Sequence, residues 1–291
     1  MDKYIIALLK VKGLGNVKVL NYVTEHNKNI DGILKDLDEF IGKDNKLLFD
    51  KYLVEAEKEI LENKKNGIEI ISVLNDNYPQ KLLMIKEPVL YLYYKGDVSL
   101  MDNTSVAIIG SRNVTKNDEE LTVKIAKEVS SRGVTVVSGL ALGIDINAHI
   151  GSYNEKGKTI VVLPAGLKNI IPSSNEKIAS NILNNGGLLV SEYSLDIKPN
   201  KYTFVKRDRI QAALSDAIIV IKADEKSGTM NAVKVAQSSN KYVTQYIANK
   251  NKLISNTFCD TNIDIENIIA KAKVQEYNYI KKDIYKQVSL F

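Results

Sequence analysis

Hydrophobic and polar positions follow two different periods, which divide the chain into a helical first part and a strand-rich second part. Up to about residue 64, apolar residues recur at helical spacing, for example over 5–9 and over the longer segment 47–61. From Ile68 onward, short apolar runs end at glycine, proline or asparagine turns. Two early runs of this kind, 68–74 and 89–94, predict strands.

Further apolar runs alternate with helical segments after residue 100. These runs are apolar throughout, which is typical of parallel strands covered on both faces. The segments between them are long enough for the crossover connections that parallel pairing requires. Strands are expected at 105–110, 134–138, 159–163, 187–191, 217–221 and 242–246, and helices at 116–132, 144–156, 175–185, 206–214 and 229–239. The pattern predicts an α/β fold with a doubly wound, mostly parallel sheet.

The same pattern predicts three parts along the chain. Residues 1–64 form a small helical unit, and residues 65–258 form the α/β unit. Residues 259–291 contain one helical pattern over 265–272, followed by a tail rich in lysine and tyrosine.

Composition narrows the class of protein. The chain has 291 residues, of which 44% are hydrophobic and 26% charged, as in globular proteins. Forty Lys and Arg against 35 Asp and Glu give a net charge of +5, which permits nucleic-acid binding without requiring it. The single cysteine, Cys259, excludes an internal disulfide, and with two histidines no metal site is expected. We find no signal peptide and no apolar run of membrane-spanning length, so we expect a cytoplasmic protein with no membrane partner.

Turns rich in Gly, Ser or Thr follow several of the predicted strands. Helices that begin at such turns present backbone amides and a positive dipole end, which bind anionic oxygen. In an open parallel sheet these turns gather at the carboxyl ends of the strands, so we expect a face that binds a polyanion. Small residues are also needed where a helix packs closely on a strand, so close packing remains an alternative explanation for these turns. The candidate residues are Gly110, Ser111, Ser138, Gly139, Ala141, Gly143, Gly166, Ser227 and Gly228.

Three arginines accompany these turns. Arg112 follows the first turn, and Arg207 and Arg209 belong to the helix before strand 217–221. Arginine is suited to bidentate phosphate contacts, so we favour a ligand-binding role. A solvated helix face is the alternative, and Asp208 could offset one of the charges.

Asp145 and His149 lie four residues apart, and so on one face of the expected helix. They could form an acid–base pair, but no partnered nucleophile is evident, and structural support is the favoured reading. A dinucleotide cofactor is not expected, because the glycine spacing differs and the strand ending at Leu163 is followed by no carboxylate. A P-loop is also missing, so no cofactor is expected.

These residues resemble the DprA/Smf DNA-processing family. The resemblance is carried by 106–112, by the Ser-Gly-x-Ala-x-Gly-Ile-Asp-x-x-Ala-His element over 138–149, and by Phe204-x-x-Arg-Asp-Arg209. It implies an extended Rossmann-like fold behind a small helix-hairpin-helix or SAM-like domain. It also implies single-stranded DNA binding, dimerisation and delivery of the DNA to the RecA recombinase in natural transformation or related recombination, without catalysis. The turn Gly13-Leu-Gly15 fits such a hairpin, although a plain helix–helix turn is an equal alternative.

The resemblance assigns roles by position. Arg112 with the Gly110-Ser111 turn would grip phosphate, the loop 138–143 would line the pocket, and Arg207 and Arg209 would flank it.

The chain also departs from the family pattern. Asp208 stands where the family usually has Asn. The segment Ile171-Pro172-Ser173 replaces a Tyr-Pro element that is often followed by Lys. The winged helix that some members carry is not expected, because the sequence leaves no room for it.

Two further readings concern enzymatic activity and the chain end. A nucleotide sensor or phosphoribohydrolase-like enzyme on the same fold is the alternative function, although the turn 227–231 lacks the glutamate of that enzyme class.

Gln287, Leu290 and Phe291 resemble the short peptide that docks on the DNA polymerase sliding clamp, and the protein could then act as an adaptor. The alternative is that Leu290 and Phe291 pack on the protein's own surface.

Overall fold

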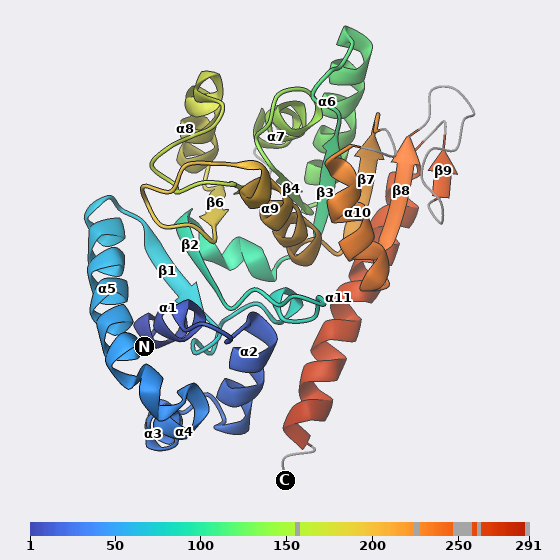
Figure 1. Cartoon of the computed structure of the whole chain (residues 1–291). Coiled ribbons are helices and arrows are strands. Elements are labelled where there is room, and N and C mark those ends of the chain that lie inside the picture. The colour runs from blue at the N-terminus through green and yellow to red at the C-terminus, as the bar shows by residue number, and fades with distance from the viewer. Residues whose placement is uncertain (155–157, 224–226, 247–257, 261–262, 289–291) are drawn as a thin grey trace.

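The computed structural model describes residues 1–154, 158–223, 227–246, 258–260 and 263–288. The chain begins with a group of helices that lies against one side of a large sheet (Figure 1). These helices are α1 (Lys3–Lys10), α2 (Asn16–Glu25), α3 (Ile30–Lys35), α4 (Leu37–Ile41) and α5 (Lys46–Lys65).

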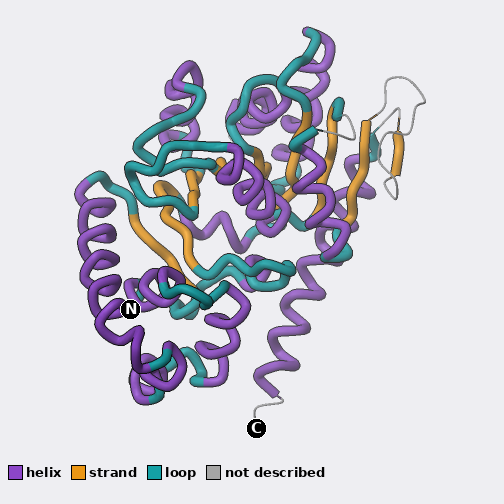
Figure 2. Tube along the Cα trace, viewed as in Figure 1, coloured by secondary structure: helices purple, strands orange, loops and turns teal. Residues whose placement is uncertain are grey.

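The rest of the chain alternates between strands and helices, as the Cα trace shows (Figure 2). The strands are β1 (Glu69–Ser72), β2 (Tyr91–Gly96), β3 (Ser105–Gly110), β4 (Thr135–Ser138), β5 (Thr159–Val162), β6 (Leu188–Ser191), β7 (Ala217–Ile221), β8 (Tyr242–Tyr246) and β9 (Phe258–Asp260). The helices are α6 (Lys116–Ser131), α7 (Ile144–Asn154), α8 (Glu176–Asn184), α9 (Lys201–Leu214), α10 (Thr229–Ser238) and α11 (Ile265–Val288). Short 3-10 helices are η1 (Lys43–Asn45), η2 (Gln80–Leu82), η3 (Val98–Asp102) and η4 (Ser173–Asn175).

The described strands form a nine-stranded sheet in the order β1-β2-β6-β5-β4-β3-β7-β8-β9. Pairing is parallel from β6 to β9 and antiparallel only where β2 meets β1 and β6. From β3 the chain winds outward through β4, β5 and β6 and then returns to place β7 on the other side of β3. The winding direction therefore reverses between β3 and β7, which is where open α/β sheets bind ligands. The expected mostly parallel, doubly wound α/β fold is confirmed.

Both faces of the sheet are covered. Ala107 and Ile109 of β3 belong to a hydrophobic cluster with α9, α10 and the N-terminal helices. Val106 and Ile108 point to the opposite face and pack with α6, α7 and α11. Figure 1 shows these helix layers on either side of the strands. This double coverage explains why the central strands, such as β3 and β7, are apolar at most positions.

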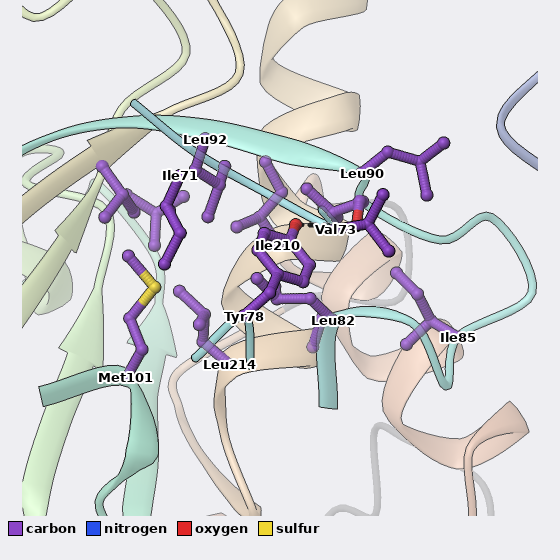
Figure 3. Close-up of a cluster of buried hydrophobic side chains, with 14 of the residues drawn as sticks. Ile71, Val73, Tyr78, Leu82, Ile85, Leu90, Leu92, Met101, Ile210 and Leu214 are labelled. Atoms are coloured by element: carbon purple, nitrogen blue, oxygen red, sulfur yellow. Dashed lines mark hydrogen bonds between the residues drawn. The ribbon is translucent and has the colours of Figure 1, made fainter. Parts of the chain in front are cut away.

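Helix α9 is held against the sheet by the segment between β1 and β2. Tyr78 is fully buried there and donates a hydrogen bond to the carbonyl oxygen of Val89 at 2.7 Å. Its ring packs with Leu82, Ile210 and Leu214, so that the lead-in segment and α9 share one core (Figure 3).

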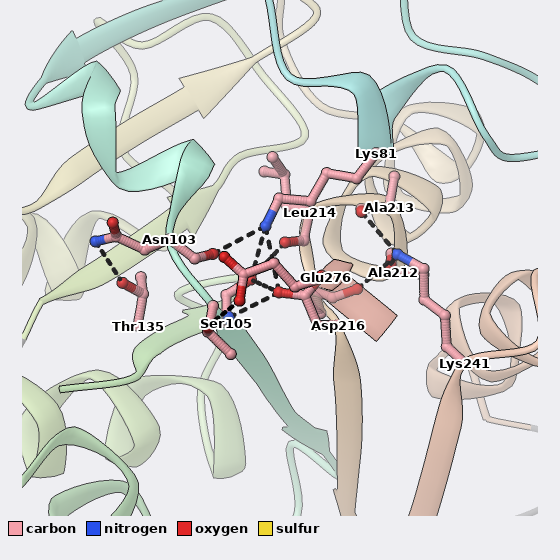
Figure 4. Close-up of polar contacts among 12 residues, drawn as sticks. Lys81, Asn103, Ser105, Thr135, Ala212, Ala213, Leu214, Asp216, Lys241 and Glu276 are labelled. Atoms are coloured by element: carbon pink, nitrogen blue, oxygen red, sulfur yellow. Dashed lines mark hydrogen bonds and ion pairs between the residues drawn. The ribbon is translucent and has the colours of Figure 1, made fainter. Parts of the chain in front are cut away.

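A buried polar cluster fixes the C-terminal end of α9 (Figure 4). Lys81 Nζ lies 3.4 Å from Asp216 Oδ2 and donates to Ser105 Oγ at 3.2 Å. The Ser105 amide donates to the same carboxylate at 2.8 Å. Lys241 Nζ donates to the last carbonyls of α9, including those of Ala212 at 2.7 Å and Ala213 at 2.8 Å. Burial lowers the pKa of the Lys241 ammonium group to about 7.

Some element boundaries differ from the sequence prediction. Helix α9 starts at Lys201 rather than at residue 206, because Asn200 caps it: its side chain accepts from the Tyr202 and Thr203 amides, and Thr203 bonds back. The helix expected to end at residue 272 continues to Val288, replacing most of the expected tail. Residues 265–288 contain no glycine or proline, and their Lys, Gln and Glu residues are good helix formers.

The limits of the three parts stay predictions. Helix α5 ends at Lys65, next to the first limit, but α1–α5 share a hydrophobic cluster with β1, β2, α9 and α10. The second limit, between residues 258 and 259, falls inside β9, which pairs with β8 in the same sheet.

Candidate nucleic-acid interface

A cavity of about 290 Å³ opens at the carboxyl ends of β3 and β7, where the winding of the sheet reverses. Its walls come from the turn after β3, the start of α7 and one face each of α9 and α10. The lining residues are Ile109, Gly110, Arg112, Ala141, Asp145, Lys201, Phe204, Val205, Arg207, Asp208, Gln211, Gly228, Thr229 and Asn231.

Cations and an aromatic ring meet at the mouth of this cavity. The Arg112 guanidinium lies 5.0 Å from the centre of the Phe204 ring, within cation–π distance. Arg112 is exposed, and among the described residues it makes no ion pair. Lys201 is also exposed, one helical turn before Phe204 on α9. The mouth therefore offers two cationic side chains and a ring face to a ligand.

Arg207 is held inside the wall rather than offered to solvent. Its side chain is 4% exposed, and its Nη1 lies 3.5 Å from Asp145 Oδ2. Its Nε lies 3.3 Å from Asp208 Oδ1. In the amide orientation that satisfies both groups, Gln211 Oε1 accepts from Arg207 Nη1 at 3.2 Å and from the Gly139 amide at 2.9 Å. Gly139 is required here because a Cβ at this position would overlap the guanidinium.

Two carboxyl groups lie beside Arg207, and burial raises the pKa of both. For Asp145 the nearby Arg207 opposes this shift. For Asp208 the pKa rises to about 6, although Arg207 and the hydrogen bond from Asn231 Nδ2 at 3.3 Å oppose it. The wall is therefore a network of one guanidinium and two carboxyl groups.

His149 lies outside the cavity. It is fully buried, and its Nδ1 is 2.7 Å from Thr159 Oγ1, which bonds in turn to the Val136 carbonyl at 2.8 Å. Burial lowers the pKa of the imidazole to about 3, so the ring is neutral. His149 lies on α7 with its ring against β5 and away from the cavity, which supports the structural role over the acid–base pair.

The expectation that the glycine-rich turns present unpaired amides is wrong at several positions. The Ser111 amide donates to Lys222 O at 2.9 Å, and the Ile144 amide donates to Ser111 O at 3.1 Å. The Gly166 amide donates to Ile197 O at 3.0 Å. Gly143 has φ +79° and lies so close to Ser111 that a Cβ would overlap the carbonyl oxygen. At these turns the alternative reading, close packing, accounts for the small residues.

Arg209 does not flank this cavity as expected. It points to the other side of α9, where it pairs with Glu192 and donates to the Glu87 carbonyl at 3.3 Å. Arg207 and Arg209 are two positions apart on a helix, so their side chains leave it on nearly opposite sides. Burial raises the pKa of the Glu192 carboxyl group, and Arg209 opposes that shift.

The structure brings together only part of the expected set. Among those residues the cavity is lined by Gly110, Arg112, Ala141, Asp145, Arg207 and Gly228. The expected residues that do not line it are Ser111, Ser138, Gly139, Gly143, Gly166, Arg209, Ser227 and His149. Ser138 is buried, and its hydroxyl donates to Ile108 O at 2.7 Å.

Several residues that line the cavity are not among those expected from the sequence. Lys201 and Phe204 are the main ones, followed by Gln211 and Asn231. Asn200 followed three residues later by Thr203 is a helix-start signal that would have placed Lys201 and Phe204 on one turn of α9.

The other residues singled out in the sequence do not line this cavity where the structure describes them. Ile171, Pro172 and Ser173 do not line it. Gln287 lies in the last turn of α11, whereas Leu290 and Phe291 fall outside the described residues. Within the described part of the chain, no three His, Cys, Asp or Glu side chains gather as a metal site would require. No helix there is both long and apolar enough to cross a bilayer.

The sequence of this chain is similar to those of a known protein family. Residues 69–282 match the family model described as DNA recombination-mediator protein A. Protein Smf of Borreliella burgdorferi is 34% identical over 230 residues, which cover 78% of this chain and 72% of that protein. DNA processing protein DprA of Streptococcus pneumoniae is 32% identical over 232 residues, covering 79% of this chain and 81% of the relative.

Two solved structures show the same architecture. The crystal structure of DprA from Streptococcus pneumoniae has a TM-score of 0.76 at 28% identity and covers 93% of this chain and 98% of its own. The structure of DNA processing protein A from Helicobacter pylori has a TM-score of 0.61 at 33% identity, covering 69% of this chain and 94% of its own. That structure is described as giving insights into a single-stranded DNA binding mode.

Proposed function

Because this chain belongs to the DNA recombination-mediator protein A family, we propose that its cavity at the β3–β7 switch point binds the backbone of single-stranded DNA. One observation carries the proposal: exposed Arg112 lies 5.0 Å from the centre of the Phe204 ring, with exposed Lys201 one turn away. Single-strand binders combine cations for the phosphates with an aromatic face for a base.

The buried network beside this mouth supports a positioning role for Arg207. Asp145 and Asp208 hold its guanidinium at 3.5 and 3.3 Å, and its side chain is 4% exposed. Arg207 also lies 5.9 Å from the centre of the Phe204 ring, on which Arg112 already rests. Arg207 therefore helps to hold the Phe204 ring at the mouth of the cavity, where Arg112 and Lys201 would meet the phosphates.

The finer parts of the proposal follow from the family. The protein would act as a homodimer that delivers single-stranded DNA to RecA in recombination or natural transformation, in the cytoplasm. It would perform no catalytic step. Docking of Gln287, Leu290 and Phe291 on a sliding clamp is a separate proposal that rests on their sequence alone.

Titration of fluorescent oligo-dT by anisotropy over a salt series tests the proposed function. We expect binding whose log K falls with log salt by about 0.7 per neutralised phosphate. Unlabelled nucleoside monophosphate should compete poorly, because it offers one phosphate instead of many. No binding of oligo-dT at low salt would refute the proposal, and cleavage of the monophosphate would favour the phosphoribohydrolase-like alternative.

Asp208 should make this binding depend on pH. Its pKa is raised to about 6, so the carboxyl group is neutral below that pH and gains a negative charge as the pH rises through it. That charge repels phosphate, and we expect affinity to fall about threefold to tenfold between about pH 5 and about pH 7.5. Anisotropy titrations at constant ionic strength measure this change.

The Asp208→Asn variant is the matched control, because the amide is isosteric and does not ionise. Its affinity should change much less over the same pH interval. An equal pH dependence in both proteins would assign the effect to another group.

A further inference from the structure

A second groove of about 470 Å³ lies beside the cavity, on the other side of the first turns of α9. Val205 and Asn231 line both hollows, so the two adjoin. The groove is bounded by the segment after η2, the outer face of α9 and the exposed face of α10. Its lining residues are Ile85, Lys86, Glu87, Val205, Lys206, Arg209, Asn231, Lys234, Val235 and Ser238.

Positive charge predominates in this groove. Lys86 and Lys234 are exposed, and neither makes an ion pair among the described residues. Lys206 and Arg209 both pair with Glu87, which is 46% exposed. Arg209 is balanced further by buried Glu192. The groove therefore has two lysines without a carboxylate partner in the described part of the chain. They lie on opposite sides of it, because Lys86 precedes β2 and Lys234 belongs to α10.

The floor of the groove is apolar. Ile85 is buried, Val235 is partly buried, and Val205 is 49% exposed between the two hollows. An apolar floor between cationic banks matches a nucleic acid chain, whose bases and sugars offer apolar faces beside charged phosphates. A purely apolar peptide would leave both lysines without counter-charges, so the observations favour the polyanion.

We propose that this groove is a second DNA subsite, which takes the nucleotides next to those held in the cavity. Val205 and Asn231 form the passage between the two, and Lys86 and Lys234 contact the phosphates of the continuing strand. This inference rests on the proposed function. It adds that the strand leaves the cavity across α9 and α10 rather than along the edge of the sheet.

The test compares the wild-type protein with Lys86→Ala/Lys234→Ala on two oligo-dT lengths. An oligomer of about 2 nucleotides can occupy the cavity of about 290 Å³ without reaching far into the groove, whereas one of about 20 nucleotides can occupy both. We expect the variant to bind the longer oligomer about threefold to tenfold more weakly, with a salt slope smaller by about 1.4, and to bind the shorter one unchanged. Lys35→Ala/Lys58→Ala removes two exposed lysines from α3 and α5 and is the charge-matched control.

The outcomes distinguish a failure of the second subsite from a failure of the proposed DNA-binding function. Equal affinity of wild type and Lys86→Ala/Lys234→Ala for the longer oligomer overturns the second subsite and leaves the cavity intact. Equal weakening by the control double variant also overturns it, because net charge would then explain the loss. If the wild-type protein binds neither oligomer, the proposed function itself fails.

Discussion

Arg112→Ala should weaken the binding of single-stranded DNA by about 10- to 100-fold, since a hydrogen bond to a charged group contributes about 1.5–3 kcal/mol. The loss should be similar for all sequences, because a phosphate contact carries no base information. The salt slope should shrink by about 0.7. Anisotropy titrations of the variant over a salt series measure both quantities.

Two matched variants sharpen this result. Arg112→Lys keeps the charge but loses the planar fork and its stacking on Phe204, so it should recover only part of the affinity. Arg132→Ala removes an arginine from the far end of α6, where it pairs with Glu128 and Glu266, and should bind as the wild type does. Wild-type affinity in Arg112→Ala would exclude this arginine from the interface.

Lys81→Met should lower the free energy of unfolding by about 3–5 kcal/mol, because it leaves the Asp216 carboxylate buried without its closest cation. Lys81 and Asp216 are 7% and 0% exposed, so water cannot replace the lost partner. Their cluster also joins the start of β3 to the end of α9, the two elements that carry the cavity. Urea denaturation followed by circular dichroism measures the change.

Two comparisons isolate the role of burial. The double variant Lys81→Met/Asp216→Asn has no buried unpaired charge and should regain much of the lost stability. Lys46→Met removes one partner of an exposed pair, 2.8 Å from Asp38, and should cost at most about 1 kcal/mol. If Lys81→Met were no more destabilising than Lys46→Met, the buried pair would not matter for stability.

The sheet could be predicted because burial on both faces leaves a strong trace in the sequence. The run 105–110 is apolar at almost every position and corresponds to β3, which is covered by α9 on one face and α6 on the other. Helix ends were harder to place. The start of α9 depends on one side chain, Asn200, and the long course of α11 depends on the absence of a breaker rather than on an apolar stripe.

The position of the cavity could be predicted from the sequence, but its detail could not. Small residues after β3 and β4 marked the edge of the sheet where the cavity opens, yet the sequence does not show whether a glycine faces a ligand or a neighbouring loop. Gly139 is small because Arg207 lies against it, and Gly143 because Ser111 does. Which arginine reaches solvent also depends on tertiary partners: Arg112 has no ion pair among the described residues, whereas Arg207 and Arg209 meet buried carboxyl groups.

The central position of β3 couples ligand binding to the stability of the whole molecule. Gly110 ends a strand that has neighbours on both sides and a helix layer over each face, so it belongs to the region that opens only with global unfolding. A molecule seated against that strand is released when the protein unfolds, so its binding raises the free energy of unfolding by RT ln(1 + L/Kd), where L is the free ligand concentration. Occupancy of the switch point would therefore register as a higher melting temperature of the entire domain.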